Sequence, residues 1–506
     1  MITESFDVVI IGAGLSGIGA AVHLQRDCPQ KSYTILEARD AMGGTWDLFR
    51  YPGIRSDSDM YTLGYNFKPW TNPKAIADGP SIREYIRETA VENGIDKKIR
   101  YGNKVLNAQW STEASTWTLE IEDKNAGTQR QITCNFLLSC AGYYNYDAGY
   151  EPEFKDRDAF KGTIIHPQKW PEHFDYRGKR VVVIGSGATA VTLVPAMTDK
   201  AAHVTMLQRS PTYVATLPEE DVISNKLREY LPEKLVYRLA RTRNIAFSLG
   251  FYKASRRYPK KIRELLLAQV KRQVGPDFDM KHFTPKYNPW DERLCAVPNG
   301  DMFRVLRKGK ASVVTDHIDR FTEKGIRLQS GKELEADVII TATGLNVQIL
   351  GGIALNVDGQ PFDYTQKMQY KGVMIEDLPN LGMVFGYTNA SWTLKADLTV
   401  EYICRLLNLM DKKNAKQCTP RNRDPKVHHI PFLDMTSGYI QRALSKVPQQ
   451  GNISPWKLYQ NYAFDLVLLR YGKIEDGIME FSNKEKVIRS SRSKLKHNWL
   501  GGLLSA

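Results

Sequence analysis

The sequence predicts an α/β protein with two dinucleotide-binding, Rossmann-like domains and a helical insertion. Two glycine-rich loops carry this prediction, at residues 12–17 (GAGLSG) and 185–190 (GSGATA). Each loop directly follows a short apolar run, residues 8–11 and 181–184. This order predicts a buried strand, a tight glycine turn and the start of a helix. Such a unit binds phosphate, because a helix N-terminus attracts negative charge. One such loop is a weak signal, but two that lie about one domain apart predict two bound dinucleotides.

The first loop is expected to bind the adenosine half of FAD, or NAD. Residues 32–36 have the composition of a strand, and Glu37 follows them. A carboxylate at that place accepts hydrogen bonds from the ribose hydroxyls and repels a 2′-phosphate. The cofactor-binding residues expected here are Gly12, Gly14, Gly17 and Glu37.

The second loop is expected to bind NADPH. Residues 203–207 have the composition of a strand, and Gln208, Arg209 and Ser210 follow without an acid. A guanidinium can pair with a 2′-phosphate through two hydrogen bonds, which favours NADPH over NADH. A solvated surface charge is the alternative for Arg209. The cofactor-binding residues expected here are Gly185, Gly187, Ala188, Thr189, Arg209 and Ser210.

The domain boundaries follow from the loops and from composition. A glycine-poor stretch with helical periodicity comes after the second loop, and an apolar strand ending in Thr343-Gly344 comes after that stretch. We expect the FAD-binding domain in residues 1–145 and 377–483 and the NADP-binding domain in residues 146–215 and 301–376. We expect the helical insertion in residues 216–300 and a basic tail in residues 484–506.

Composition and cysteine use indicate a large cytoplasmic enzyme. The 506 residues are 42% hydrophobic, enough for more than one core. No signal peptide and no run of 18 apolar residues are found, and we expect no metal site. The six cysteines are scattered without a CxxC pair, which indicates reduced thiols and argues against a disulfide reductase.

The net charge of +14 leaves two interpretations open. Basic residues concentrate in residues 241–272, where aromatic residues are interspersed, and in residues 484–496. These stretches are interpreted either as solvated helical faces or as a peripheral membrane contact that flanks a substrate entry path. No nucleic-acid motif is present, so nucleic acid is not expected as a partner.

A motif between the two loops narrows the prediction to a family. Residues 160–171 contain Phe160, Gly162, His166, Trp170 and Pro171 in the spacing FxGxxxHxxxWP. This motif, with a glycine-rich loop on each side, resembles the fingerprint of the Baeyer–Villiger flavin monooxygenases. Residues 43–57 and 288–293 also resemble that family. The resemblance implies that NADPH reduces FAD, that O₂ adds at the flavin C4a carbon, and that one oxygen atom then enters a ketone to give an ester or lactone. Thioethers and thioamides are also implied as substrates.

The same resemblance implies roles for individual residues. Arg293 is the catalytic cation and Asp57 its acidic partner beside the flavin. Gly43 and Gly44 let the backbone approach the flavin pyrophosphate, next to Thr45. Trp46 stacks near the flavin ring or belongs to the core, and neither interpretation is preferred.

Two further residues of the motifs need separate interpretations. His166 is interpreted as a positioning residue during domain movement and not as a general base. Glu292 departs from the family, because many ketone-oxidising relatives have a lysine before the catalytic arginine that contributes to the 2′-phosphate site.

Two other functions are weighed against this one. The first is an N- or S-oxygenating flavin monooxygenase with little ketone activity, against which Trp170-Pro171 and Arg293 argue. The second is a non-catalytic, NADP-responsive binding protein, against which the complete first loop and Glu37 argue.

Overall fold

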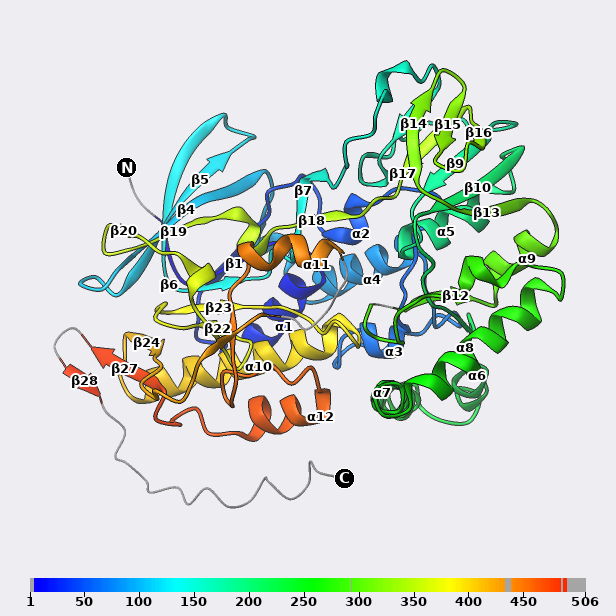
Figure 1. Ribbon diagram of the computed structural model, residues 1–506. Helices are drawn as coiled ribbons and strands as arrows, with labels where there is room; N and C mark the ends of the chain where they lie inside the picture. The colour runs from blue at the N-terminus through cyan, green and yellow to red at the C-terminus, as the bar shows by residue number, and fades with distance from the viewer. Residues whose placement is uncertain (1–3, 293, 433–437, 484–485, 489–506) are drawn as a thin grey trace.

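The molecule consists of two lobes, each built around its own β-sheet (Figure 1). The structure is a computed structural model that describes residues 4–292, 294–432, 438–483 and 486–488. The larger lobe contains the N-terminal strands and helix α10 (Trp392–Lys412). The smaller lobe contains the middle of the chain.

The larger lobe contains an eleven-stranded sheet with the order β20-β19-β4-β5-β6-β1-β2-β3, to which β23, β22 and β21 add beside β6. β1, β2 and β6 pair in parallel, so their carboxyl ends meet at one edge. β4, β5 and β6 pair antiparallel. The strands are β1 (Glu4–Ile11), β2 (Tyr33–Leu36), β3 (Ile99–Arg100), β4 (Asn103–Ser111), β5 (Thr116–Asp123), β6 (Thr128–Ser139), β19 (Ala354–Val357), β20 (Gln360–Pro361), β21 (Gln369–Tyr370), β22 (Met374–Ile375) and β23 (Leu381–Met383).

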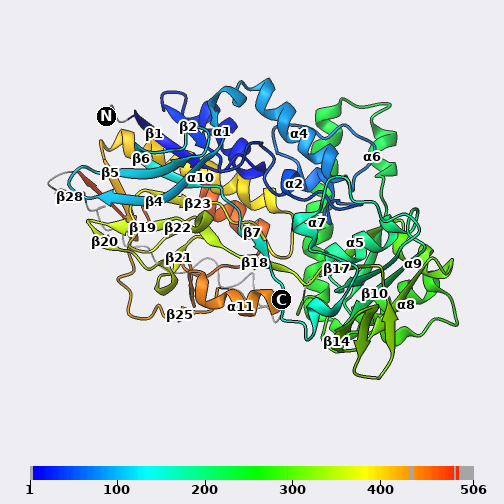
Figure 2. The same ribbon diagram turned by 90° about the horizontal axis from the view of Figure 1, so that it is seen from above.

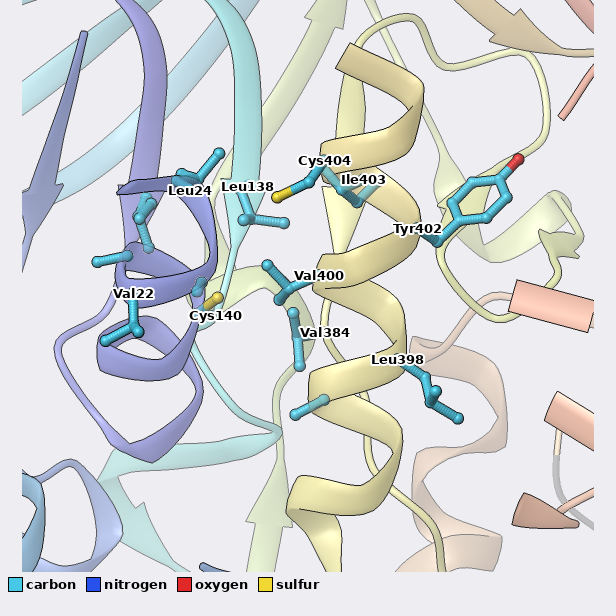
Figure 3. Close-up of a cluster of buried hydrophobic side chains, with 14 of the residues drawn as sticks. Val22, Leu24, Leu138, Cys140, Val384, Leu398, Val400, Tyr402, Ile403 and Cys404 are labelled. Carbon is cyan, nitrogen blue, oxygen red and sulfur yellow. The ribbon is translucent and has the colours of Figure 1, made fainter. Parts of the chain in front are cut away.

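Two helices from opposite ends of the sequence cover one face of this sheet. α1 (Leu15–Asp27) packs against α10, and Leu138, Val400 and Cys404 lie between them (Figure 3). These side chains are nearly inaccessible to solvent, so the apolar area that they bury stabilises the association of distant segments. Three further helices follow the first loop in the chain: α2 (Thr45–Leu48), α3 (Met60–Leu63) and α4 (Gly79–Glu92).

The smaller lobe contains a five-stranded parallel sheet with the order β13-β10-β9-β17-β8. Its strands are β8 (Thr163–Ile165), β9 (Arg180–Ile184), β10 (His203–Gln208), β13 (Ala311–Thr315) and β17 (Val338–Thr341). α5 (Ala188–Met197) and α9 (Asp301–Arg307) pack on one face. A small antiparallel sheet accompanies it, formed by β14 (Ile318–Thr322), β15 (Gly325–Leu328) and β16 (Glu333–Glu335).

The expected insertion is largely helical. It contains α6 (Val222–Leu227), α7 (Glu233–Arg257) and α8 (Pro259–Val274), and the parallel pair β11 (Val214–Leu217) and β12 (Cys295–Pro298) brackets it. α7 lies beside α3 of the larger lobe (Figure 1). The insertion therefore reaches from the smaller lobe to the larger one.

Two chain segments connect the lobes and pair with each other. β7 (Tyr144–Gly149) leads out of the larger lobe, and β18 (Leu345–Val347) leads back, antiparallel to it (Figure 2). The chain therefore re-enters the larger lobe at an earlier residue than the sequence predicts. The sequence predicts residues 354–376 in the NADP-binding domain, but β19 pairs with β4 and β22 pairs with β23 of the larger sheet. The boundary expected at residue 376 is wrong, because these strands have only two to four residues and give no periodic signal.

The remaining elements lie mainly along the C-terminal part of the larger lobe. They are α11 (Gly438–Ala443), α12 (Tyr462–Asp465), the π-helical segment Leu466–Tyr471, β24 (Gln417–Pro420), β25 (His429–Ile430), β26 (Gln450–Gly451), β27 (Met479–Asn483) and β28 (Lys486–Ile488). The 3-10 turns are Asp96–Lys98, Arg157–Ala159, Pro167–Lys169, Met280–Phe283, Ile349–Gly352, Tyr364–Gln366 and Leu444–Lys446.

Candidate active site

The first glycine loop joins β1 to α1 at the carboxyl edge of the larger sheet. Gly12 has φ +97, a conformation that L side chains rarely adopt, and an added Cβ would lie 2.9 Å from the carbonyl oxygen of Cys140. A Cβ on Gly17 would lie 1.9 Å from the carbonyl oxygen of Gly12. Gly14 is the N-cap of α1, and no side chain caps this helix start. The first N–H groups of α1 therefore remain available for an anion.

Glu37 lies at the end of β2, directly beneath this loop. Its side chain is buried, and its two carboxylate oxygens accept hydrogen bonds from the amides of Ala13 at 2.7 Å and Arg39 at 2.9 Å. Burial raises the pKa of Glu37, and these two backbone donors oppose that shift. A carboxylate oxygen has more than one lone pair, so Glu37 can still accept hydrogen bonds from ribose hydroxyls.

The segment from Gly43 to Trp46 lies against the first loop. Gly44 has φ +56, and a Cβ on it would lie 3.0 Å from Cα of Gly14, so the two loops meet backbone to backbone. The hydroxyls of Thr45 and Tyr146 are 3.2 Å apart. Trp46 is partly buried against the core and also lines the neighbouring cavity.

Sequence reasoning missed an ion-pair network beside this site. The buried carboxylate of Asp47 contacts Arg39 at 2.8 Å, Arg50 at 2.5 Å and Arg83 at 3.4 Å. Arg39 also lines the cavity. Arg39 and Arg50 are close to Asp47 in the sequence, so local charge pairing was a usable signal. Arg83 comes from α4 and gave no such signal.

These elements enclose a cavity of about 480 Å³. An aromatic wall bounds part of it, where the rings of Tyr143 and Trp392 are stacked at 5.1 Å between centroids and Phe385 packs against both. The aromatic wall also was not predicted. The cavity brings together most of the residues expected at the first dinucleotide: Gly12, Gly14, Glu37, Gly43, Gly44, Thr45, Trp46 and Asp57. Gly17 lies below it, in the contact between loop and helix.

The second glycine loop joins β9 to α5 in the smaller lobe. Gly185 has φ +138, and a Cβ there would lie 2.3 Å from the carbonyl oxygen of Ala342. Gly187 is the N-cap of α5 and has no atom within 4 Å of an added Cβ, so open space lies above the helix start. The adjacent Ala188 is exposed and Thr189 half-buried.

Arg209 and Ser210 lie exposed beside this loop, directly after β10. The Ser186 hydroxyl donates to the carbonyl oxygen of Ser210 at 3.1 Å, which joins the two turns. Burial raises the pKa of Glu292, while the charge of Arg209 opposes that shift, so the two side chains interact. Glu292 is thus an acid at the expected 2′-phosphate position.

His166 lies at the end of β8 and contacts both connecting segments between the lobes. Its Nδ1 accepts from the amide of Gln168 at 3.2 Å, so the other nitrogen, Nε2, carries the proton and donates to the carbonyl oxygen of Gly344 at 3.2 Å. A Cβ on Gly149 would lie 2.0 Å from the imidazole ring. Burial lowers the pKa of His166, so the neutral ring is favoured. Nδ1 is thus engaged by the turn Pro167–Lys169, and Nε2 by the residue directly before β18.

The rest of this motif is part of the packing. Phe160 is buried against Phe321, and Gly162 allows close approach to the carbonyl oxygen of Asp337, 2.5 Å from an added Cβ. Trp170 packs edge-on against Phe174, and Pro171 is exposed.

Residues 51–57 connect the first site to the smaller lobe. A Cβ on Gly53 would lie 2.5 Å from Cβ of Ala196 in α5, and Arg55 pairs with Asp301 of α9 at 2.5 Å. Tyr51 is buried in the core of the smaller lobe, and burial raises its pKa to about 12. This segment ends at Asp57, so packing between the lobes determines where that carboxylate lies.

A second cavity of about 640 Å³ adjoins the first. Asp57, Ser58 and Ala390 line both cavities. The second cavity is mainly apolar and lies against the insertion, where Phe251 and Leu266 line it together with residues of α6 and the segment 388–391. The expected catalytic cation, Arg293, lies outside the described residues. Its neighbours Trp290 and Leu294 line the second cavity.

The residues present fit two dinucleotides. The backbone contact between Gly14 and Gly44, the uncapped start of α1 and the buried Glu37 suit a pyrophosphate with its ribose. The open start of α5 and the exposed Arg209 suit a second dinucleotide with a 2′-phosphate. Two dinucleotide turns on adjoining lobes, with an apolar cavity at the first of them, define an oxidoreductase with two dinucleotide-binding domains.

Comparison with known proteins gives the family. The FMO-like model, described as flavin-binding monooxygenase-like, matches residues 69–349. An NAD(P)-binding Rossmann-like domain model matches residues 10–72. The chain belongs to the flavin-binding monooxygenase-like family.

One curated relative and two solved structures illustrate the similarity. The FAD-containing monooxygenase EthA of Mycolicibacterium smegmatis is 55% identical over 97% of this chain and 100% of its own length. A structure of cyclohexanone monooxygenase matches with a TM-score of 0.70 at 22% identity, over 83% of this chain and 90% of that chain. A structure of OTEMO with FAD and NADP matches with a TM-score of 0.69 at 22% identity, over 83% of this chain and 88% of that chain.

Several predictions from the sequence are thereby confirmed. The fold is α/β with two Rossmann-like dinucleotide-binding domains, and the protein is a flavin monooxygenase of the oxidoreductase class. The expected FAD and NADP agree with the cofactors named for these proteins. The alternative of a non-catalytic binding protein does not fit membership in this enzyme family.

Proposed function

We propose that this flavin monooxygenase uses FAD, NADPH and O₂ to insert one oxygen atom into ketones, giving esters or lactones, and that it also oxidises thioethers and thioamides. The observation that carries the proposal is the junction of the two cavities at Asp57. There the cavity at the first glycine loop shares lining residues with a largely apolar pocket, which is also lined by Trp290 and Leu294 near Arg293 in the sequence. When bound, the flavin accepts hydride from NADPH and activates O₂.

The first cavity is proposed to hold FAD through the backbone and a few side chains. Glu37 binds the ribose hydroxyls, and the amides at the start of α1 bind the pyrophosphate, with Gly14 and Gly44 leaving room for it. Arg39 supports this site, because its guanidinium lines the cavity and is held by Asp47. The stacked Tyr143 and Trp392 exclude water from one side.

NADPH is proposed to bind at the start of α5, with its 2′-phosphate on Arg209 and Ser210. Glu292 limits the affinity, because its negative charge faces the same guanidinium. Competition between a carboxylate and the phosphate for Arg209 predicts a high KM for NADPH compared with relatives that have a lysine at this place.

The second cavity is proposed to bind the ketone or sulfide. Its apolar wall suits a hydrocarbon substituent, and Asp57 lies at the end nearest the first cavity. By the family resemblance, Arg293 supplies a fixed positive charge where negative charge develops on oxygen, and Asp57 holds that arginine in place. Preorganised charge of this kind is usually among the largest contributions to catalysis.

The test is oxygen-dependent NADPH consumption by the purified, flavin-loaded protein with a panel of ketones and thioethers, with identification of the products. Esters or lactones from ketones support the proposal. Sulfoxides without any ester would favour the alternative of an S-oxygenating flavin monooxygenase. NADPH consumption that yields only hydrogen peroxide with every substrate would contradict both.

Arg293→Ala separates binding from chemistry. We expect the variant to retain FAD and slow flavin reduction, and to lose ketone oxidation by about 100–1000-fold, the cost of one oxyanion-type donor. Asp57→Asn, which keeps the side-chain shape, should lose less. An Arg293→Ala variant that makes ester at nearly the wild-type rate would contradict the assigned role.

A further inference from the structure

Exposed apolar side chains are concentrated on the helical insertion. Of the twelve large hydrophobic side chains that are strongly exposed among the described residues, eight lie between residues 222 and 265. We call these eight the insertion patch; they are Val222, Ile223, Tyr230, Leu235, Leu239, Phe247, Tyr258 and Leu265. Scattered single exposures are ordinary, but these eight belong to the neighbouring elements α6, α7 and α8 and the turns beside them, and such a concentration indicates a contact surface.

The insertion patch continues into the second cavity. Phe247, Ile223 and Leu265 are 67%, 62% and 60% exposed, yet all three also line that cavity, so they form its rim. In α7, residues 235, 239, 243, 247 and 251 form one row at i, i+4 spacing. The row begins with the exposed Leu235 and Leu239, has the ion-paired Arg243 in its middle, and ends with Phe247 stacked on Phe251 at the mouth of the cavity. Exposed apolar side chains of the insertion therefore form part of the pocket's rim.

Positive charge is concentrated in the same part of the chain as the insertion patch. Residues 222–274 contain 14 Lys and Arg against 3 Asp and Glu, a net charge of +11, while the whole chain has +14. Lys234 and Arg238 flank the exposed leucines, and Lys260 and Lys261 begin α8. These four cations form no ion pair within the described part of the chain, whereas Arg243 and Arg256 are neutralised by Asp221 and Asp291. The unpaired cations lie on the exposed side of the insertion.

We propose that the insertion patch docks on an anionic lipid bilayer and that the second cavity takes apolar substrate from that surface. Apolar side chains inserted at the headgroup level with lysines around them are the features of interfacial helices. Each cation near an anionic surface contributes about 1 kcal/mol. No helix in the described residues meets the length and hydropathy needed to span a bilayer.

The identity of the substrate rests on the proposed function, but the docking does not. An apolar substrate dissolves in the bilayer, so a pocket that opens at its surface is supplied without passage through water. The chemical class that follows is a ketone or thioether with a long hydrocarbon chain. Short, water-soluble analogues would gain nothing from the lipid.

The docking test uses the full-length protein and vesicles, without any activity measurement. Co-sedimentation is measured with vesicles of phosphatidylcholine alone and with vesicles of phosphatidylcholine and phosphatidylglycerol in equal parts. We expect binding to the anionic vesicles, weakened by salt because the screening length falls from about 10 Å at 0.1 M to about 3 Å at 1 M. Lys260→Gln/Lys261→Gln should lower the partition coefficient by roughly 30-fold, from about 1 kcal/mol per charge. Leu235→Gln/Leu239→Gln should also lower it.

Matched variants elsewhere on the surface make the test specific. Lys97→Gln/Lys98→Gln removes two exposed lysines from a 3-10 turn, and Val467→Gln removes an exposed apolar side chain from the C-terminal part. Neither should change vesicle binding. Equal binding to neutral and anionic vesicles, equal effects of the two lysine pairs, or tighter binding to duplex DNA than to anionic vesicles would overturn the proposal.

An activity measurement then separates docking from function. Adding anionic vesicles should raise oxidation of a long-chain ketone and leave that of a short-chain ketone unchanged, and Leu235→Gln/Leu239→Gln should remove only the increase. If vesicle binding follows the expected pattern but no ketone is oxidised, the proposed reaction is wrong and the docking stands. If ketones are oxidised and vesicles are not bound, the docking is wrong.

Discussion

Replacement of His166 gives a direct test of how the two lobes are coupled. The Gly344 carbonyl also accepts from the amide of Tyr150 at 3.0 Å, so it keeps a partner when the imidazole is removed. The amide of Gln168 does not, because Nδ1 of His166 accepts its hydrogen bond. His166→Ala therefore leaves one donor unsatisfied, at about 1–3 kcal/mol, and removes one further hydrogen bond, at about 1 kcal/mol.

Two conservative variants separate the contributions of the two hydrogen bonds to this loss of stability. In His166→Asn the amide oxygen can take the place of Nδ1, and in His166→Gln the amide nitrogen can take the place of Nε2. Since only the Nδ1 acceptor lacks a substitute, we expect stability and coupling to decrease in the order wild type, Asn, Gln, Ala. Denaturant unfolding measures stability, and stopped-flow flavin reduction by NADPH with steady-state kinetics measures coupling. A positioning residue should change kcat and KM together.

The pH dependence gives an independent measurement. Burial lowers the pKa of His166 below its ordinary 6.5, so the neutral ring contributes stability that is fully present above pH 6.5 and is lost as the pH falls through the lower folded value. The wild type should lose stability in that window, and His166→Asn should lose less of it. A different result would refute the positioning role and identify a general base. In that case the kcat of His166→Asn would fall by about 100–10,000-fold, and the acid limb would disappear from its pH–rate profile.

Three further predictions concern the dinucleotide sites. Arg209→Ala should raise the KM for NADPH by about 10–100-fold, the equivalent of a charged hydrogen bond at 1.5–3 kcal/mol, and leave that for NADH unchanged; equal effects on both would contradict the 2′-phosphate assignment. Glu292→Gln should lower the KM for NADPH several-fold, because it removes the carboxylate that acts on Arg209, and an unchanged KM would exclude that competition. Gly17→Ala should yield protein without flavin absorbance, because its Cβ would lie 1.9 Å from the Gly12 carbonyl oxygen. The control is Gly250→Ala, which has open space around the added Cβ. This variant should retain flavin and be stabilised by up to about 1 kcal/mol.

Local chemistry explains what the sequence could predict. Gly12, Gly185 and Glu37 lie within strand-turn-helix units that a short stretch of sequence makes recognisable, and the structure has these units where the pattern predicts them. The twenty-one residues of α10 have apolar side chains at helical spacing, and these side chains form its buried face. Such features need no knowledge of distant contacts.

The other parts of the site are formed by segments that are distant in the sequence, so local sequence patterns could not predict them. The second cavity combines the insertion with residues 388–391, and the aromatic wall combines Tyr143 with Trp392. The sequence did not predict that the chain re-enters the larger lobe at β19. The four residues of β19 do not by themselves indicate that this strand pairs with β4. The sequence predicts that α7 is helical. Only the structure shows that some of its exposed side chains lie at the rim of a cavity.

The pairing of β6 with β23 and of α1 with α10 has a consequence for synthesis. The smaller lobe lies within the sequence of the larger one, so the ribosome completes it first, while the larger sheet still lacks β23 and its covering helix. At about 5–20 residues per second, the N-terminal strands wait for tens of seconds with an apolar face and an unpaired edge. The nascent larger lobe is therefore the part of the chain that depends on chaperones, and a truncation before α10 should leave an aggregating product even though the smaller lobe within it can fold.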